Sequence, residues 1–277
     1  MLLGPPSVQC FDSLPIGPRM RHSRLLIGTV LPALLFLTPA WADLAPNILL
    51  IVSEDNGPEL GSYGGPYART PNLDRLAEQG VRFENAFVPY SVCSPSRAAF
   101  LTGLYPVQNG QIGLATHKFA MYRKDTPNFA TLLKSSGYYT GLIGKLHVNP
   151  ESAFDFDFRA IPGANFNREH SVQDYADAAS QFWADTGDKP FFLSVNFPDA
   201  HLPFLRQANG RPKRPLSADD VRPMPWVGVD SARIREQVAN YYNCLERLDD
   251  GVGLLLAELE RTGLAQNTIV FYIGDHG

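Results

Sequence analysis

The chain has 277 residues, a formal net charge of −4 and 44% hydrophobic residues. This composition is typical of a folded globular domain and excludes an intrinsically disordered chain. The slight excess of negative charge argues against a nucleic-acid partner, because proteins that bind the phosphate backbone need a basic face.

The first 42 residues are interpreted as a targeting segment. Three arginines precede an apolar run over residues 25–37, and small residues at Ala40 and Ala42 fit a signal-peptide cleavage site. The alternative is a membrane anchor, but Pro32 interrupts a run that is shorter than the roughly 18 apolar residues of a spanning helix. We therefore expect a cleaved signal peptide, no stable membrane span and a periplasmic or secreted product.

Four apolar runs predict strands that are buried on both faces of a sheet. They cover residues 47–52, 138–143, 190–197 and 267–273. Alternating polarity predicts one further short strand over residues 81–85. Helices are predicted after Thr70-Pro71, after a cap near Ser96, after Thr126-Pro127, over residues 172–183, and over a long segment that ends at Gly263. Because strands and helices alternate, we predict an α/β fold with a mostly parallel sheet flanked by helices.

The chain ends directly after its last predicted strand, in the polar sequence Asp275-His276-Gly277. A sheet of this kind normally continues through a further helix. We therefore expect residues 43–277 to be the N-terminal part of a larger domain that is truncated at its C-terminus.

Chemically capable residues follow four of the predicted strands. They are Glu54 and Asp55, Lys145 and His147, Asp199 and His201, and Asp275 and His276. In open α/β sheets, the active crevice lies at the carboxyl ends of the strands. The sequence therefore predicts an active site at this edge of the sheet.

Three of the four carboxylates among these residues predict a cation site. Glu54, Asp55 and Asp275 would repel one another unless a cation held them together, and oxygen ligands suit Ca²⁺ or Mg²⁺. His276 is a softer ligand that suits zinc or manganese better, so the pattern leaves the metal open. The alternative for Glu54 and Asp55 is a solvated turn after a strand.

The cysteines offer two interpretations. Cys10 would be removed with the leader, which leaves Cys93 and Cys244 as a candidate disulfide pair or as buried structural thiols. Cys93 also begins the sequence Cys-Ser-Pro-Ser-Arg just before a predicted helix, where anions bind. There a thiol is a candidate nucleophile, and Arg97 offers a planar, permanently charged partner for an oxyanion.

The sequence Cys-Ser-Pro-Ser-Arg-Ala-Ala-Phe-Leu-Thr-Gly from Cys93 onward resembles the signature of the sulfatases in the alkaline phosphatase superfamily. The early acidic pair, the Gly-Lys-Leu-His segment at residues 144–147 and the late Asp-His-Gly stand in the order typical of that family, and the resemblance runs from about Pro46 to the end. Within the family, the chain is most similar to the heparan N-sulfatase (sulfamidase) type, through residues 93–98, 144–148 and 154–156.

The resemblance implies that a maturation enzyme oxidises Cys93 to formylglycine. One hydroxyl of the hydrated aldehyde then attacks sulfur, and the other loses a proton and expels sulfate. A thiol would leave a trapped adduct, whereas a geminal diol has an internal route to release it.

The resemblance also implies a role for each matching residue. The metal ligands would be Glu54, Asp55, Asp275, His276 and the converted Cys93, with Ca²⁺ expected first and Mg²⁺ or Mn²⁺ as alternatives. Arg97 and Lys145 would stabilise the formylglycine and the sulfate oxygens. His147 would take the proton from the diol, and His201 would bind sulfate or protonate the leaving oxygen. The expected substrate is a sulfated carbohydrate, with N- and O-sulfate both open.

The chain departs from the family pattern in two places. Glu54 stands where the family usually has aspartate, so it would bind the metal in another mode or from behind the direct ligands. A basic residue that reaches the sulfate in relatives, and a smaller C-terminal subdomain, would both lie beyond Gly277. Two alternatives to the sulfatase function stay open. One is a phosphodiesterase or phosphonate monoester hydrolase of the same superfamily, and the other is an inactive truncated fragment.

Overall fold

A five-stranded sheet forms the centre of the computed structural model, which describes residues 45–163 and 169–277. The strands are β1 (Asn47–Ser53), β2 (Tyr139–Gly144), β3 (Phe158–Ala160), β4 (Phe191–Asn196) and β5 (Thr268–Gly274). They lie in the order β3-β2-β4-β1-β5, and all neighbouring pairs are parallel. The predicted α/β class with a mostly parallel sheet is confirmed.

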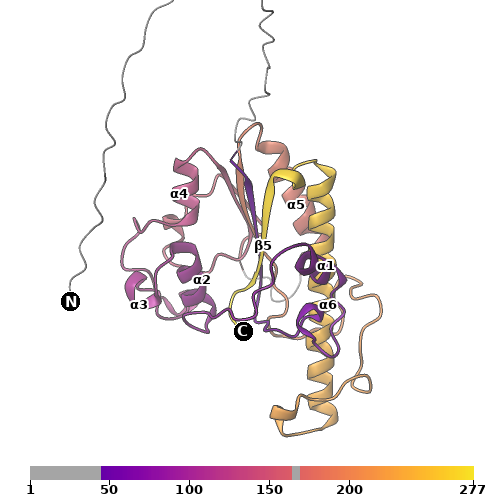
Figure 1. The fold of residues 1–277 in the computed structure, drawn as a ribbon. Helices are drawn as coiled ribbons and strands as arrows, with labels where there is room; N and C mark the ends of the chain where they lie inside the picture. Colours follow the sequence, from indigo (N-terminus) through magenta and orange to yellow (C-terminus); the bar gives the residue numbers. More distant parts are fainter. Residues whose placement is uncertain (1–44, 164–168) are drawn as a thin grey trace, which may run out of the picture. The chain divides into compact units, whose positions relative to one another are not determined.

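Helices cover both faces of the sheet (Figure 1). One face carries α2 (Cys93–Thr102), α3 (Pro106–Asn109) and α4 (Phe129–Ser135). The other carries α1 (Pro71–Gln79), α5 (Val172–Asp185) and α6 (Ala232–Arg261). Short 3₁₀ helices lie in the connections, at η1 (Gly61–Tyr63), η2 (Ala115–His117), η3 (Glu151–Ala153), η4 (Pro225–Val227) and η5 (Ala265–Asn267).

Each of the two faces has its own hydrophobic core. Leu49 and Ile51 of β1 pack with α5 and α6, whereas Leu50 and Val52 of the same strand pack with α2 and α4. Successive side chains of a strand point to opposite faces, so a strand covered on both sides needs apolar residues throughout. Each fully buried aliphatic or aromatic side chain contributes about 1.5–3 kcal/mol. This double burial explains why the sequence predicted β1, β2 and β4 to within one or two residues at each end. The apolar run of β5 was placed equally well, but the expectation that it is buried on both faces is wrong, because β5 is the edge strand and leaves Ile269 and Phe271 exposed.

The predicted strand at residues 81–85 is wrong. The segment has no strand pairing, and Val81 and Phe83 are largely exposed. Arg82 instead contacts the ring of Tyr63 and the backbone oxygen of Ser62, so the segment is held by a side chain in place of a ladder. Alternating polarity indicates a strand only where a neighbouring strand is available to pair with it.

Two predicted helix starts are also displaced. The helix expected at Thr126-Pro127 is α4, which begins at Phe129, because the Asn128 side chain accepts a hydrogen bond from the Thr131 amide (3.2 Å) and caps it. The helix expected near Ser96 is α2, which begins at Cys93 with Val92 as its N-cap. Cys93 therefore occupies the first turn of α2, and Ser96 lies within the helix.

The predicted leader, residues 1–42, lies outside the described residues. In the part of the chain that the structure describes, none of the helices has both the length and the apolar character needed to cross a bilayer. The signal peptide, export and the division at residue 43 therefore stay predictions.

Gly144, the last residue of β2, lies where the strand ends are closely packed. Its φ is 87°, and a Cβ atom built there would collide with the backbone oxygen of Asn196. Gly187 has a similar φ of 59° but no heavy atom within 4 Å of such a Cβ. We expect Gly187→Ala to lose about 1–2 kcal/mol of unfolding free energy from the unfavourable φ alone. Gly144→Ala should lose about 1–3 kcal/mol more because of the collision.

Urea denaturation of the two variants measures this difference. Equal losses for Gly144→Ala and Gly187→Ala would show that the approach of Asn196 to β2 is not a packing constraint.

Candidate active site

The carboxyl ends of four strands bring the predicted site residues to one edge of the sheet. Glu54 and Asp55 follow β1, Lys145 and His147 follow β2, His201 follows β4, and Asp275 and His276 follow β5. Strands β1 and β5 are direct neighbours, with Ser53 paired to Gly274, so the two acidic ends lie side by side. The N-terminus of α2 brings Cys93 to the same place, as its contacts with Asp55 and His276 show.

Four side chains form a group that could hold a metal ion. One ligand atom from each of Asp55, Cys93, Asp275 and His276 lies within 4.8 Å of all the others. The Nε2 atom of His276 is 2.9 Å from Oδ1 of Asp55 and 3.3 Å from Sγ of Cys93, which in turn is 3.9 Å from Oδ1 of Asp55. Two carboxylates and an imidazole around one point suit a divalent cation. Four of the five predicted metal ligands are therefore brought together.

Glu54, the fifth predicted ligand, has charged partners of its own. Its Oε1 atom is 2.6 Å from Nζ of Lys145 and accepts a hydrogen bond from Nη2 of Arg97 at 3.1 Å. Burial raises the pKa of the Glu54 carboxyl, and the charges of Arg97 and Lys145 act against that rise. Its Oε2 atom is also buried and makes no hydrogen bond among the described residues. Metal ligation by Glu54 therefore stays a prediction, while its ion pairs with two cations are observed.

Arg97 is buried and directs its guanidinium at protein groups. Nε donates to Oδ2 of Asp275 at 3.0 Å, and Nη2 donates to Glu54. Nη1 donates to the backbone oxygen of Lys145 and to Oδ1 of Asn196, both at 2.9 Å. The guanidinium thereby connects groups at the ends of β1, β2, β4 and β5. These contacts give Arg97 a positioning role. Its predicted contact with an oxyanion of the substrate stays a prediction.

The thiol of Cys93 lies among cationic groups. Burial raises its pKa, but the surrounding side chains outweigh burial and lower the pKa to about 4. These side chains are the imidazoles of His147, His201 and His276, with a further contribution from the charge of Lys145. Hydrogen bonds to Asp55 and Cys93 in turn raise the pKa of His276 to about 10. The surroundings thus favour a negatively charged group at position 93.

Two residues of the site have strained backbone conformations. Asp55 has a φ of 48° and His147 a φ of 57°, in the left-handed region that residues with a Cβ rarely adopt. Such conformations cost about 1–3 kcal/mol each and occur preferentially at functional sites. The Asp55 amide donates to Oδ1 of Asp275 at 3.1 Å, which helps to hold Asp55 in this conformation.

Sequence reasoning missed residues that position the site. Asn196 is buried, accepts from Arg97 and donates to Oγ of Ser194 at 3.0 Å. Ser96 donates from within α2 to the backbone oxygen of Asp275. A polar Asn196 at the end of the apolar strand β4 was a usable signal, because buried polar groups need partners. Neither Cys93 nor Cys244 is in a disulfide, so the alternative of a disulfide between them is not observed.

Comparison with known proteins identifies the family of this chain. Residues 46–277 match the family model described as Sulfatase. The chain belongs to the sulfatase family. It is 33% identical over 257 residues to human N-sulphoglucosamine sulphohydrolase, a match that covers 83% of this chain and 50% of that protein. It is also 33% identical over 263 residues to bovine arylsulfatase A, covering 84% of this chain and 52% of that protein.

The fold is likewise similar to those of solved sulfatase-family structures. One, described with the metabolism of multiple glycosaminoglycans by Bacteroides thetaiotaomicron, superposes with a TM-score of 0.70 at 20% identity. This similarity covers 84% of this chain and 61% of that one. The chain spans about half the length of the two curated sulfatases it matches.

The lowered pKa of Cys93 predicts unusual thiol reactivity in metal-free protein made without maturation enzyme. Thiolate is the reactive form, and with a pKa of about 4 it already predominates at pH 5. We expect the rate of Cys93 alkylation by iodoacetamide to change less than about threefold from pH 5 to pH 8, whereas an ordinary thiol reacts about tenfold faster per pH unit there. Peptide mass spectrometry follows the reaction, and Cys93→Ser is the control. A tenfold rise per unit would contradict the geometry around Cys93.

A calcium titration separates direct ligands from the ion pairs behind them. We expect Asp55→Asn to weaken Ca²⁺ binding by at least about a hundredfold, because Asp55 belongs to the four-residue group. Glu54→Gln should weaken it by about tenfold, at the low end of the loss of about 10–100-fold that is usual for residues that hold ligands in place. Isothermal titration calorimetry measures both. Equal losses would show that Glu54 is a direct ligand.

Proposed function

We propose that the protein to which this chain belongs hydrolyses the sulfate ester or sulfamate groups of sulfated carbohydrates. The observation that carries the proposal is the convergence of Asp55, Cys93, Asp275 and His276 on one point, beside Lys145, His147 and His201. Membership of the sulfatase family supports the same reaction class.

The proposed reaction needs two groups that the unmodified polypeptide lacks, a divalent cation and a formylglycine at position 93. A divalent cation, with Ca²⁺ expected first and Mg²⁺ or Mn²⁺ as alternatives, would be held by Asp55, Asp275 and His276 and would neutralise negative charge. Position 93, converted to formylglycine by a maturation enzyme, would supply the nucleophilic hydroxyl. The donor set fits both, because conversion of Cys93 replaces a sulfur by oxygen beside two carboxylates.

The remaining residues surround position 93 as the reaction requires. His147 and His201 both lie beside the Cys93 side chain and lower its pKa, so a group at this position has two imidazoles available to take and return a proton. Lys145 adds a positive charge beside the same group, suited to sulfate oxygens. Each such preset group is typically worth about 10²–10³ in rate. Arg97 holds the strand ends, and therefore these donors, in register.

The substrate class is drawn from the names of the relatives. One relative is named for N-sulphoglucosamine and the other for aryl sulfates, at equal identity to this chain. The proposal therefore includes both N- and O-sulfate, and a sulfated sugar is the expected substrate. We further propose that residues 1–42 are a leader for export and that residues 43–277 are the N-terminal part of a sulfatase catalytic domain.

A comparison of sulfate and phosphate release tests this proposal against the rival hydrolases. With material produced alongside a maturation enzyme, we expect release of sulfate from an aryl sulfate or N-sulfoglucosamine to exceed release of phosphate from the matched aryl phosphate by at least about tenfold. Cys93→Ala should abolish it, because position 93 supplies the nucleophile. Peptide mass analysis reports the conversion of Cys93.

The other outcomes of this comparison would each favour one of the alternative functions. A clear preference for phosphate would replace the sulfatase proposal by a phosphodiesterase or phosphonate monoester hydrolase. Complete conversion at position 93 without turnover of any substrate would identify the 277-residue chain as an inactive fragment.

A further inference from the structure

We propose that Asp199 and Arg247 are positioning residues that hold His201 at the active site. This inference rests on the proposed function, because His201 is assigned there to proton transfer or sulfate binding. Neither Asp199 nor Arg247 belongs to the group of metal-ligand candidates.

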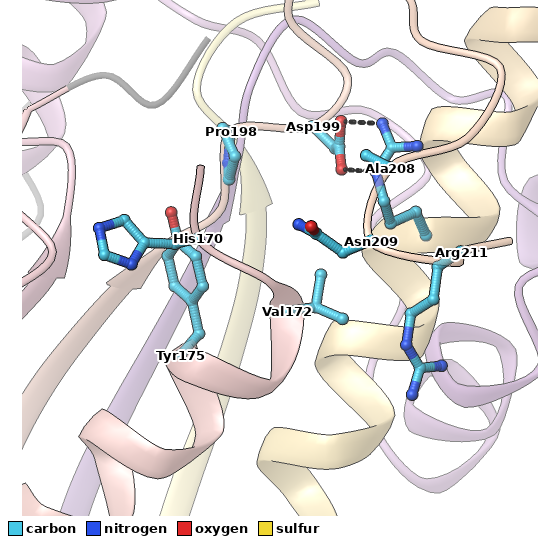
Figure 2. A pocket seen from close by; sticks show the side chains of 9 residues that line it. His170, Val172, Tyr175, Pro198, Asp199, Ala208, Asn209 and Arg211 are labelled. Carbon is cyan, nitrogen blue, oxygen red and sulfur yellow. Dashed lines mark hydrogen bonds and ion pairs between the residues drawn. The ribbon is translucent and has the colours of Figure 1, made fainter. Parts of the chain in front are cut away.

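The two residues form a buried, two-point ion pair. Nε of Arg247 donates to Oδ2 of Asp199 at 2.8 Å, and Nη2 donates to Oδ1 at 2.7 Å. Only 3% of the Arg247 side chain and 2% of the Asp199 side chain are exposed. Figure 2 shows the Asp199 carboxylate facing the guanidinium, with the two bonds dashed. Such a parallel pair fixes orientation as well as distance.

Arg247 is hydrogen-bonded to the chain on both sides of His201. It comes from the middle of α6, binds Asp199 two residues before His201, and donates from Nη1 to the backbone oxygen of Leu205 four residues after it (3.4 Å). The segment that carries His201 is therefore attached to a long, packed helix at two points.

The backbone around Asp199 is attached to the opposite side of the site. The Glu54 amide donates to the backbone oxygen of Asp199 at 2.9 Å, and the Ala200 amide donates to the backbone oxygen of Glu54 at 2.6 Å. The His201 amide donates to Pro198 at 3.0 Å and closes a turn. The turn is thus held between β1 and α6.

The His201 side chain extends from this turn to Asp55 of the site. Its Nδ1 atom is 2.7 Å from the backbone oxygen of Leu202, and its Nε2 atom is 3.6 Å from Oδ2 of Asp55. A buried ion pair is weak evidence for stability, because desolvation offsets the attraction between its charges. Its effect on geometry is larger, since a displacement of about 1 Å can cost 10²-fold in rate.

Substitutions of the pair test the inference in the full chain. We expect Asp199→Asn and Arg247→Gln to lower kcat for an aryl sulfate by about 10–100-fold with less than about a threefold change in KM. Arg247→Lys keeps the charge but loses the two-point contact, so its kcat should lie between those of Arg247→Gln and the unchanged chain.

Asp249→Asn is the matched control on the same helix. Asp249 is equally buried and accepts from the backbone amides of Asn72 and Leu73, so it attaches α6 to α1 and not to the His201 segment. We expect Asp249→Asn, Asp199→Asn and Arg247→Gln all to lower the melting temperature, because each disturbs a buried polar contact. Asp249→Asn should nevertheless leave kcat within about threefold. Equal loss of kcat in Asp249→Asn, or unchanged kcat in Asp199→Asn, would overturn the inference.

A spectroscopic measurement separates this inference from the proposed function. In ¹H–¹⁵N spectra of the histidine side chains, with His201→Ala for assignment, Asp199→Asn should shift the His201 signals and Asp249→Asn should not. If the unchanged chain turns over no substrate, it is the inactive fragment considered above, while this shift still decides whether the pair positions His201. If Asp199→Asn does not fold, Arg247→Lys replaces it in both measurements.

Discussion

The burial of the Arg97 guanidinium is the constraint on which the arrangement of the site depends. An arginine keeps its charge in a protein, and a buried charge is costly unless each donor finds an acceptor. Here the acceptors come from the ends of four strands: Glu54, the Lys145 backbone, Asn196 and Asp275. Satisfying one side chain therefore sets the spacing of the strand ends, and with it the spacing of the residues that follow them.

Charge balance within this edge assigns the acidic residues to different tasks. Glu54 is paired with Arg97 and Lys145, whereas Asp55 faces the imidazoles of His276 and His201. Asp275 belongs to both environments, since it accepts from Arg97 and lies in the metal-candidate group. Two neighbouring carboxylates, Glu54 and Asp55, are thus placed in different electrostatic surroundings. The strained backbone at Asp55 is maintained by this surrounding network.

Much of the fold could be predicted because it depends on local patterns. Strands β1, β2 and β4 are buried on both faces and, like the partly exposed edge strand β5, appear as continuous apolar runs. The residues after these strands could be assigned to one edge from the rule for parallel sheets. The strand at residues 81–85 was wrongly predicted because its alternation resembles a half-buried strand, while pairing is decided by distant segments. β3 was missed because three residues carry too little pattern.

The sequence by itself determined four of the five strands, the chemical identity of the site residues and their position after these strands, because these follow from polarity, spacing and motif. Only the tertiary structure decided which acidic residues face one another. It separated Glu54 from the metal-candidate group, placed Cys93 in the first turn of α2, and joined Asp199 to Arg247 across 48 positions of sequence. The physical reason is that ion pairing and burial depend on distances between segments, which the local pattern of a chain does not contain.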